Sequence, residues 1–335
     1  MGRLTPSALL FVAAALIGLA CEEKGGETTI RPAAPPPAPG VVSSGGPTPG
    51  PGSEAQPTAE PVEPVEPVER RPAPLPDPAA PRLRSAEKGF VVVTREDCLR
   101  GERSYDLVVH FHGVADAVER QWSAARLGGV LAVANAGTWG RDYKAVYEQR
   151  GAYQRLLDRV DAQLAELCPE RPARVGRVAL SGWSAGYAAI RAMLRDAGNE
   201  PVDAVLLSDG IHASLVGGAG RAVLSTDVEP FVAFGELARR GEKLLSITHS
   251  AIRTPDYAST TETTDYLLER LDLTRVPARG APGADRVELR SEVTEQGFRL
   301  RGYSGESGPE HGWHLHALDE TLFADLRAWW SRPIR

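Results

Sequence analysis

Residues 177–197 read RVALSGWSAGYAAIRAMLRDA. The stretch begins with an apolar run of strand length and ends with an Ala-rich run whose apolar residues recur at helical spacing. Ser184 lies between the two runs, and Gly182 and Gly186 on either side of it leave the room that a sharp turn needs. The helix that follows directs backbone N–H groups and a partial positive charge toward Ser184. The segment therefore predicts a strand–turn–helix unit of an α/β protein, with a hydroxyl nucleophile at the turn.

Apolar runs of strand length alternate with helical patterns along the chain from about residue 84. The predicted strands are residues 89–94, 106–111, 130–135, 177–181, 204–208, 243–248 and 298–303. The predicted helices are residues 143–167, 187–196, 264–271 and 318–330. Most of these strands are continuously apolar, as expected of strands buried on both faces of a parallel sheet. The alternation predicts a doubly wound, mostly parallel sheet with helices on both faces.

A second segment adds to the Ser184 turn. Residues 106–114 read DLVVHFHGV, a predicted strand that ends in His-Gly well upstream of the serine. Together the two segments resemble the α/β-hydrolase superfamily, and the resemblance extends over roughly residues 84–335. It implies a serine hydrolase in which Ser184 is the nucleophile. The oxyanion-hole donors that it implies are the backbone N–H groups of Ala185 and of Val114 or Gly113.

The catalytic base is expected near the C-terminus, because the superfamily order places the acid and then the histidine after the nucleophile. After the last predicted strand the chain reads SGPEHGWHLH, residues 307–316. A neutral imidazole can take the serine proton at physiological pH. We predict His311 as the base, because it lies in the Gly-containing loop. His314 is the alternative, and His316 is expected in the start of the final helix.

Two carboxylates compete for the role of the triad acid. Asp209 follows the predicted strand after the nucleophile, in a Gly turn at the carboxyl edge of the sheet, where sites of open α/β sheets lie. Asp256 follows the next strand, the position commoner in the superfamily, but lacks the usual Gly-x-x-Asp signature. We predict Asp209, with Asp256 as the alternative. The hydroxyl-rich loop 254–265 either lines the substrate cleft or starts the next helix at Thr264.

The first 21 residues, MGRLTPSALLFVAAALIGLAC, have the form of an export signal. A 13-residue apolar run follows Arg3, and a permanent membrane-spanning helix takes about 20 residues. The end of the run resembles a bacterial lipoprotein cleavage box, which implies that Cys21 becomes the lipid-bearing first residue of the mature chain. We expect export and lipid anchoring to a bacterial cell membrane, in the periplasm or at the cell surface. The alternative is an ordinary signal peptide that contains a cysteine.

Residues 22–83 are predicted to be a disordered linker. Of the 27 Pro residues, 17 lie between Pro32 and Pro81, and the segment contains a threefold Glu-Pro-Val repeat. Proline removes backbone donors and favours extended polyproline II structure, so this composition builds no core. The predicted organisation is therefore a signal peptide over 1–21, a linker over 22–83 and an α/β-hydrolase domain over 84–335.

Two cysteines remain when Cys21 is assigned to the lipid. Cys98 precedes a predicted strand, and Cys168 ends a predicted helix. In an oxidising compartment outside the cytoplasm, a disulfide between them is expected. Two separate buried thiols are the alternative.

A metal-dependent hydrolase is the rival enzyme class. His110 and His112 are two residues apart on a predicted strand, and side chains at that spacing share one face. The other candidate ligands are His311, His314, His316 and Asp209. No zinc-binding pattern such as H-E-x-x-H is present, and this hypothesis leaves the Ser184 turn unexplained. The expected roles of His110 and His112 are therefore a core histidine and a residue that orients the His-Gly loop.

Composition and charge limit the classes of molecule that the protein is expected to bind. The formal net charge is −6, whereas a nucleic-acid-binding domain is usually strongly basic. No pattern indicates a nucleotide or flavin cofactor, so none is predicted. The expected substrate is a small-molecule or polymeric ester. The non-enzymatic alternative is a hydrolase-like binding lipoprotein, because fold alone does not determine function.

Overall fold

The computed structural model describes residues 77–79, 81–171, 174–217, 221–278 and 287–332. The predicted signal peptide with Cys21, and the predicted linker up to residue 76, lie outside the described residues. Contacts divide the chain into two units, and the structure described here belongs to the second, Pro72–Arg335. Among the helices in its described ranges, none combines the length and apolar character needed to cross a bilayer.

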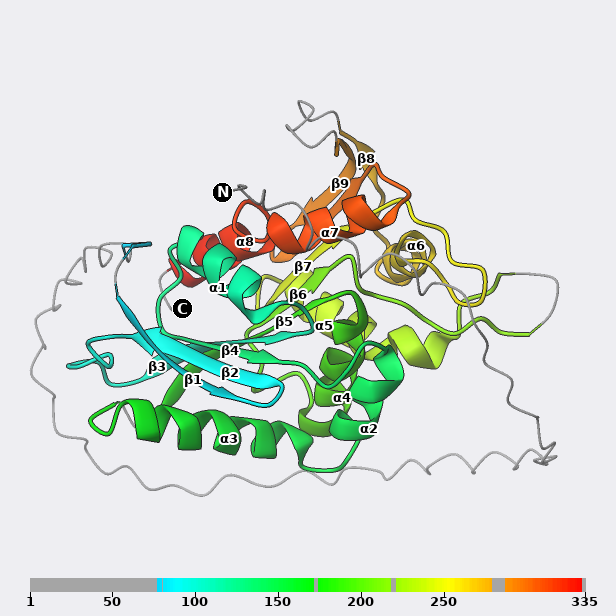
Figure 1. The fold of residues 1–335 in the computed structure, drawn as a ribbon. Coiled ribbons are helices and arrows are strands. Elements are labelled where there is room, and N and C mark those ends of the chain that lie inside the picture. The colour runs from blue at the N-terminus through cyan, green and yellow to red at the C-terminus, as the bar shows by residue number, and fades with distance from the viewer. Residues whose placement is uncertain (1–76, 80, 172–173, 218–220, 279–286, 333–335) are drawn as a thin grey trace, which may run out of the picture. The chain divides into compact units, whose positions relative to one another are not determined.

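A 10-stranded sheet forms the centre of this unit, in the order β1-β2-β4-β3-β5-β6-β7-β10-β9-β8 (Figure 1). The strands are β1 (Arg82–Glu87), β2 (Phe90–Arg95), β3 (Tyr105–Phe111), β4 (Val130–Ala134), β5 (Val175–Trp183), β6 (Ala204–Ser208), β7 (Leu244–His249), β8 (Val276–Pro277), β9 (Leu289–Glu295) and β10 (Phe298–Tyr303). The strands from β4 to β10 in this order pair in parallel, and the pairs at both ends are antiparallel. The predicted doubly wound, mostly parallel sheet is confirmed.

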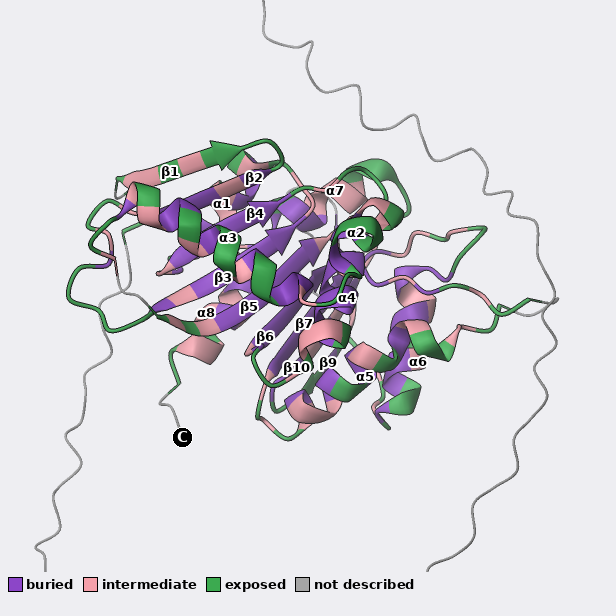
Figure 2. Cartoon of the chain, turned by 90° about the horizontal axis from the view of Figure 1, so that it is seen from below, coloured by how far each residue is buried: buried purple, intermediate pink, exposed green. Residues whose placement is uncertain are grey.

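Helices cover both faces of the sheet. They are α1 (Ala115–Ala124), α2 (Gly140–Tyr147), α3 (Ala152–Leu167), α4 (Tyr187–Ala197), α5 (Ser225–Arg239), α6 (Thr260–Arg270), α7 (Gly308–His316) and α8 (Leu322–Trp330). Helices α1, α7 and α8 lie on one face, whereas α2, α3, α4 and α5 lie on the other (Figure 1). Each face has its own apolar core, made of alternate side chains of the strands and the inner sides of the helices. Figure 2 shows the buried strands and, in front of them, helices whose outward sides are exposed.

The predicted helix over residues 143–167 is wrong as a single element. The structure has two helices there, α2 and α3, which are separated by a short turn. Gly151 precedes α3 with φ 75°, a left-handed conformation that interrupts a helix and that glycine adopts at little cost. The apolar spacing continues across the turn because both helices pack on the same core.

Several elements were not predicted. Strands β1 and β9 lie near the two ends of the sheet, and their exposed positions carry polar residues rather than an apolar run. Helices α1, α5 and α7 were also missed. Helix α5 contains Pro230, and proline inside a helical pattern is ordinarily a sign that the helix stops.

A disulfide joins Cys98 and Cys168, whose Cα atoms lie 5.4 Å apart. Cys98 lies in the connection between β2 and β3, and Cys168 directly follows α3. The bond therefore ties a surface connection to the end of the helix that covers the same side of the sheet. These are the two cysteines that remain when Cys21 is assigned to the lipid, so the structure contains the expected pair.

Candidate active site

Ser184 lies at the carboxyl end of β5, where the chain turns sharply into α4. Its φ is 48°, a left-handed conformation that is costly for a residue other than glycine. The close approach of other backbone segments explains the glycines around it. A Cβ atom on Gly186 would lie 2.1 Å from the carbonyl oxygen of Phe111, and one on Gly210 would lie 2.3 Å from that of Ser184. Backbone from β3 and from the turn after β6 thus fixes the serine in its strained conformation.

Asp209 follows β6 and is buried, with 2% of its surface exposed. Its Oδ2 atom lies 2.7 Å from Nδ1 of His311. Its Oδ1 atom accepts hydrogen bonds from the Ser250 backbone N–H at 2.9 Å, the Ser250 hydroxyl at 3.1 Å and the Thr260 hydroxyl at 3.1 Å. Three donors on one oxygen leave the other oxygen directed at the imidazole.

The pKa of Asp209 is lowered despite its burial. Burial by itself would raise the pKa, because a carboxylate is poorly solvated in the core. The charges that His314 and His311 carry when protonated, together with the hydrogen bonds from His311 and Ser250, outweigh the effect of burial. Asp209 is therefore ionised at neutral pH and can hold the Nδ1–H of His311 as a hydrogen-bond acceptor.

His311 lies within α7, not in a loop as expected from its sequence context. Helix α7 begins early because the Ser307 backbone N–H donates to the Glu310 carboxylate at 3.1 Å, as in a capping box, and Pro309 occupies the first turn. His316, expected at the start of the following helix, is instead the exposed last residue of α7. The helix presents the half-buried His311 to Asp209.

Ser184 and His311 lie at the same edge of the sheet. Trp183, the residue before the serine, stacks on the imidazole of His311 with ring centroids 4.7 Å apart. The backbone of Ser184 lies against Gly210, the residue after Asp209. Within the described residues the Ser184 hydroxyl makes no hydrogen bond, and catalytic hydrogen bonds are often long in enzymes without substrate.

The alternative acid and base occupy other positions. Asp256 is exposed in the loop after β7, and its carboxylate makes no hydrogen bond to a described residue. His314 is buried, and its Nδ1 atom lies 3.1 Å from the Thr248 hydroxyl. Burial lowers the pKa of His314 to about 4. Helix α6 begins at Thr260, earlier than the expected Thr264, because Ser259 caps its N-terminus.

The His-Gly segment after β3 forms a tight loop beside Ser184. The Gly113 N–H donates to Oδ1 of Asn135 at 3.1 Å, and Nδ2 of Asn135 donates to the Gly113 carbonyl at 2.9 Å. The Val114 N–H has no acceptor among the described residues. Of the two donors considered in this loop, Val114 is therefore the one that remains available. Asn135 follows β4, and its clamp on the loop had no recognisable signal in the sequence.

The two histidines of the predicted His-x-His pair are directed to different partners. His110 is buried, with Nδ1 2.9 Å from the Ser181 hydroxyl and Nε2 3.0 Å from the carbonyl of His112. His112 has φ 69°, and its ring turns toward the Tyr143 hydroxyl, 3.0 Å from Nδ1. Among the described residues, no three His, Cys, Asp or Glu side chains come together as a metal site would require.

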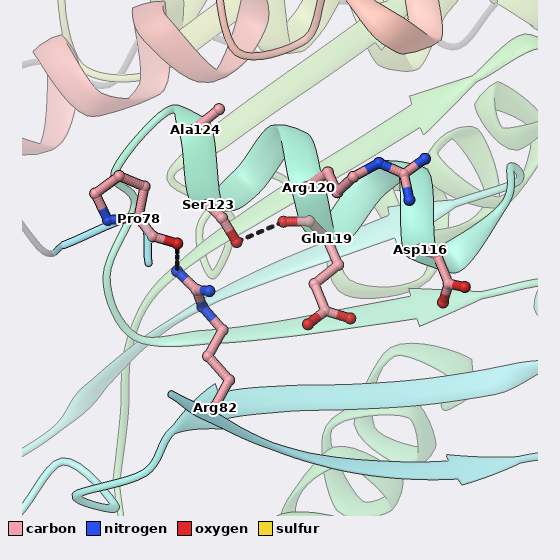
Figure 3. Close-up of a pocket in the computed structure, with 7 residues that line it drawn as sticks. All are labelled: Pro78, Arg82, Asp116, Glu119, Arg120, Ser123 and Ala124. Atoms are coloured by element: carbon pink, nitrogen blue, oxygen red, sulfur yellow. Dashed lines mark hydrogen bonds between the residues drawn. The ribbon is translucent and has the colours of Figure 1, made fainter. Parts of the chain in front are cut away.

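A shallow surface hollow of about 480 Å³ lies elsewhere, between α1 and the start of β1 (Figure 3). Its lining residues are Pro78, Arg82, Asp116, Glu119, Arg120, Ser123 and Ala124. It holds charges of both signs and no nucleophile paired with a base. The candidate residues Ser184, Asp209 and His311 lie elsewhere, at the carboxyl edge of β5 and β6 and on α7.

No family model and no curated protein sequence matches the chain. Solved structures with a similar fold include a cold-adapted esterase from an Arctic intertidal metagenomic library (16% identity, 70% of this chain and 87% of that one, TM-score 0.37). Others are the feruloyl esterase module from Clostridium thermocellum in complex with sinapinate (10%, 77% and 95%, TM-score 0.41) and the enterochelin esterase from Shigella flexneri (12%, 78% and 63%, TM-score 0.43). At these identities the activity has to be argued from the residues of the site.

Proposed function

We propose that this protein is a serine hydrolase that cleaves carboxylic esters through an acyl-enzyme intermediate. The observation that carries the proposal is the 2.7 Å contact between Asp209 and Nδ1 of His311, beside a serine held at φ 48° after β5. A buried carboxylate, an imidazole and a strained serine on three separate elements match the roles of acid, base and nucleophile.

In the proposed reaction, His311 takes the proton of the Ser184 hydroxyl through Nε2 while the oxygen attacks the ester carbonyl carbon. The carbonyl electron pair moves to the oxygen and forms a tetrahedral oxyanion. When the pair returns, the bond to the alcohol oxygen breaks and His311 gives its proton to that oxygen. Water then repeats the sequence on the acyl-enzyme, which releases the acid and restores Ser184. Asp209 stabilises the imidazolium in both halves.

The oxyanion would be bound by the backbone N–H groups of Val114 and Ala185. Ala185 lies in the single 3-10 turn that leads into α4, and the first N–H groups of a helix lack acceptors within the helix. Val114 lies directly before α1. Two donors at helix starts add the favourable field of the helix dipoles to their hydrogen bonds.

We also propose that the protein is exported and anchored by a lipid on Cys21, on the strength of the sequence alone. Wild-type protein from cells is expected in the membrane fraction. Replacement of Cys21 by Ser, with a signal peptide from a secreted non-lipoprotein in place of residues 1–20, should move it to the soluble fraction. Recovery of the wild-type protein in the soluble fraction would contradict the anchor.

The activity is tested with a series of p-nitrophenyl esters of increasing acyl length, against wild type and Ser184→Ala. We expect saturable hydrolysis by the wild type and a loss of several orders of magnitude in kcat for the variant. Each assay is repeated after treatment with a chelator. Activity that survives Ser184→Ala but not the chelator would replace the serine mechanism with the metal one. Absence of hydrolysis across the series would favour a binding protein.

A further inference from the structure

Three aromatic rings from distant parts of the sequence form a stack at the site. The indole of Trp183 stacks with the ring of His112 and with the ring of His311. The centroid of Trp183 is 5.2 Å from that of His112, with an interplanar angle of 12°, and 4.7 Å from that of His311, with an angle of 28°. The stack thus joins the His-Gly loop, the residue before the nucleophile and the base.

Trp183 also holds the backbone of the base. Its Nε1–H donates to the carbonyl oxygen of His311 at 3.0 Å. One turn further along α7, the carbonyl of His314 accepts a hydrogen bond from the Ser208 hydroxyl at 2.9 Å. Helix α7 is therefore attached to the ends of β5 and β6 at two neighbouring points of one helix face. Only the attachment through Trp183 also contacts the imidazole.

We infer that Trp183 is a positioning residue for His311, which fixes the imidazole by stacking, fixes its backbone by the indole hydrogen bond and favours its protonated form through the π face. The inference rests on the proposed function, because it assumes that His311 cycles between neutral and protonated forms. A cation within about 6 Å of an indole centroid is attracted by the ring. Asp209 at Nδ1 and the indole on one face together restrict the orientations that the imidazole of His311 can adopt.

The second histidine that stacks on Trp183 is held neutral. His112 is fixed by the Tyr143 hydroxyl 3.0 Å from its Nδ1 atom. Burial lowers the pKa of His112 to about 4, so this ring brings no positive charge toward the imidazolium of His311. Of the two histidines that stack on Trp183, only His311 therefore presents a cation to the indole in the proposed reaction.

Other titratable groups also face His311, and the test must leave them unchanged. Asp209 is the hydrogen-bonded acid, and His212, on the loop after β6, interacts electrostatically with His311. His314 does the same from one turn along α7, and His112 does so from the loop after β3. Substitutions at Trp183 replace none of these residues, although they remove the ring that stacks on His112.

The test compares Trp183→Phe, which keeps an aromatic face but loses the N–H donor, with Trp183→Met and Trp183→Leu, which lack a ring. The acid limb of kcat/KM against pH reports the base in the free enzyme. For the ring-free variants we expect the midpoint of this limb to move about half a unit to lower pH. We also expect kcat to fall by about 10- to 100-fold, with KM changed less than about threefold. Trp183→Phe should restore the midpoint.

Ser208→Ala is the matched control, because it removes the second attachment of α7 without touching an imidazole. Its acid limb should coincide with that of the wild type. An unshifted limb and unchanged kcat in either ring-free variant, or a limb displaced equally in Trp183→Phe, overturns the inference. Labelling of each variant by a fluorophosphonate separates the two proposals. Absence of labelling in the wild type removes the proposed function, whereas labelling of wild type and ring-free variants at equal rates removes only the role of Trp183.

Discussion

The substitution Asp209→Asn replaces one oxygen of the carboxylate that holds His311 with an amide nitrogen. In the protein, Oδ1 of Asp209 accepts from the backbone N–H and the hydroxyl of Ser250 and from the hydroxyl of Thr260. The backbone N–H can only donate, so the amide of the variant must place its oxygen at the Oδ1 position. Its NH₂ group then occupies the position 2.7 Å from Nδ1 of His311.

This exchange forces the wrong tautomer on the base. Nδ1 of His311 must accept from the amide, so the ring proton moves to Nε2, the atom that should accept the proton of Ser184. The geometry is kept while the chemistry is lost, and a change of this kind lowers kcat by about 10⁴-fold. The shape of the side chain is conserved, so circular dichroism and the midpoint of thermal unfolding should report a folded protein.

Asp256→Asn provides the matched control. The Asp256 side chain is exposed and not hydrogen-bonded to His311, so kcat/KM for p-nitrophenyl acetate should stay within about twofold of the wild type. Both variants are measured at the same pH and substrate range. If Asp209→Asn keeps kcat within tenfold of wild type, or if Asp256→Asn is the one that collapses, the assignment of the acid is wrong.

Three further outcomes follow from the fold. Cys98→Ser should lower the free energy of unfolding in urea by about 4 kcal/mol, because the disulfide spans a sequence separation of 70 residues; a midpoint equal to wild type would mean that the bond does not form. Gly186→Ala should destabilise the protein by about 1–3 kcal/mol and abolish activity, because its Cβ would lie 2.1 Å from a backbone oxygen. A Cβ atom on Gly312 would meet no atom within 4 Å, so Gly312→Ala should unfold no earlier than the wild type. A similar loss of stability in both variants would argue against the clash. Burial lowers the pKa of His110 to about 3 and of His314 to about 4. As the pH falls below about 6.5, these two histidines therefore take up protons in the unfolded chain before they do so in the folded protein. Each should cost about 1.4 kcal/mol of stability per pH unit down to its folded pKa, and urea midpoints that do not change between pH 7 and pH 4.5 would contradict this.

The elements that the sequence predicts best are those in the centre of the sheet. Strands such as β5 and β6 contain continuous buried runs, residues 178–182 and 204–208, because both faces are covered there, and these mainly apolar runs leave a continuous signal. Near the ends of the sheet the signal is lost, since β1 has no buried residue and β9 has only one, Val293. The break between α2 and α3 was likewise hidden, because a single left-handed residue interrupts the helix without changing the apolar spacing.

The features of the site also differ in how well the sequence predicts them. The Gly-x-Ser-x-Gly turn is local, so its glycines carry a sequence signal that the close backbone approaches explain. The choice between Asp209 and Asp256 is not local, because it depends on which carboxylate the tertiary structure brings to His311. The donors on Asp209 come from the end of β7 and the start of α6. The stack of Trp183 with two histidines joins residues that no sequence spacing connects.

The most direct measurement of the central claim is peptide mass mapping after reaction of the folded protein with a fluorophosphonate. The account predicts one adduct per chain, on Ser184, formed at the same rate with or without a chelator. It also predicts no adduct in Ser184→Ala and strongly slowed labelling in His311→Ala. An unlabelled Ser184 in protein that hydrolyses p-nitrophenyl esters, or labelling that persists in Ser184→Ala, would contradict the serine mechanism.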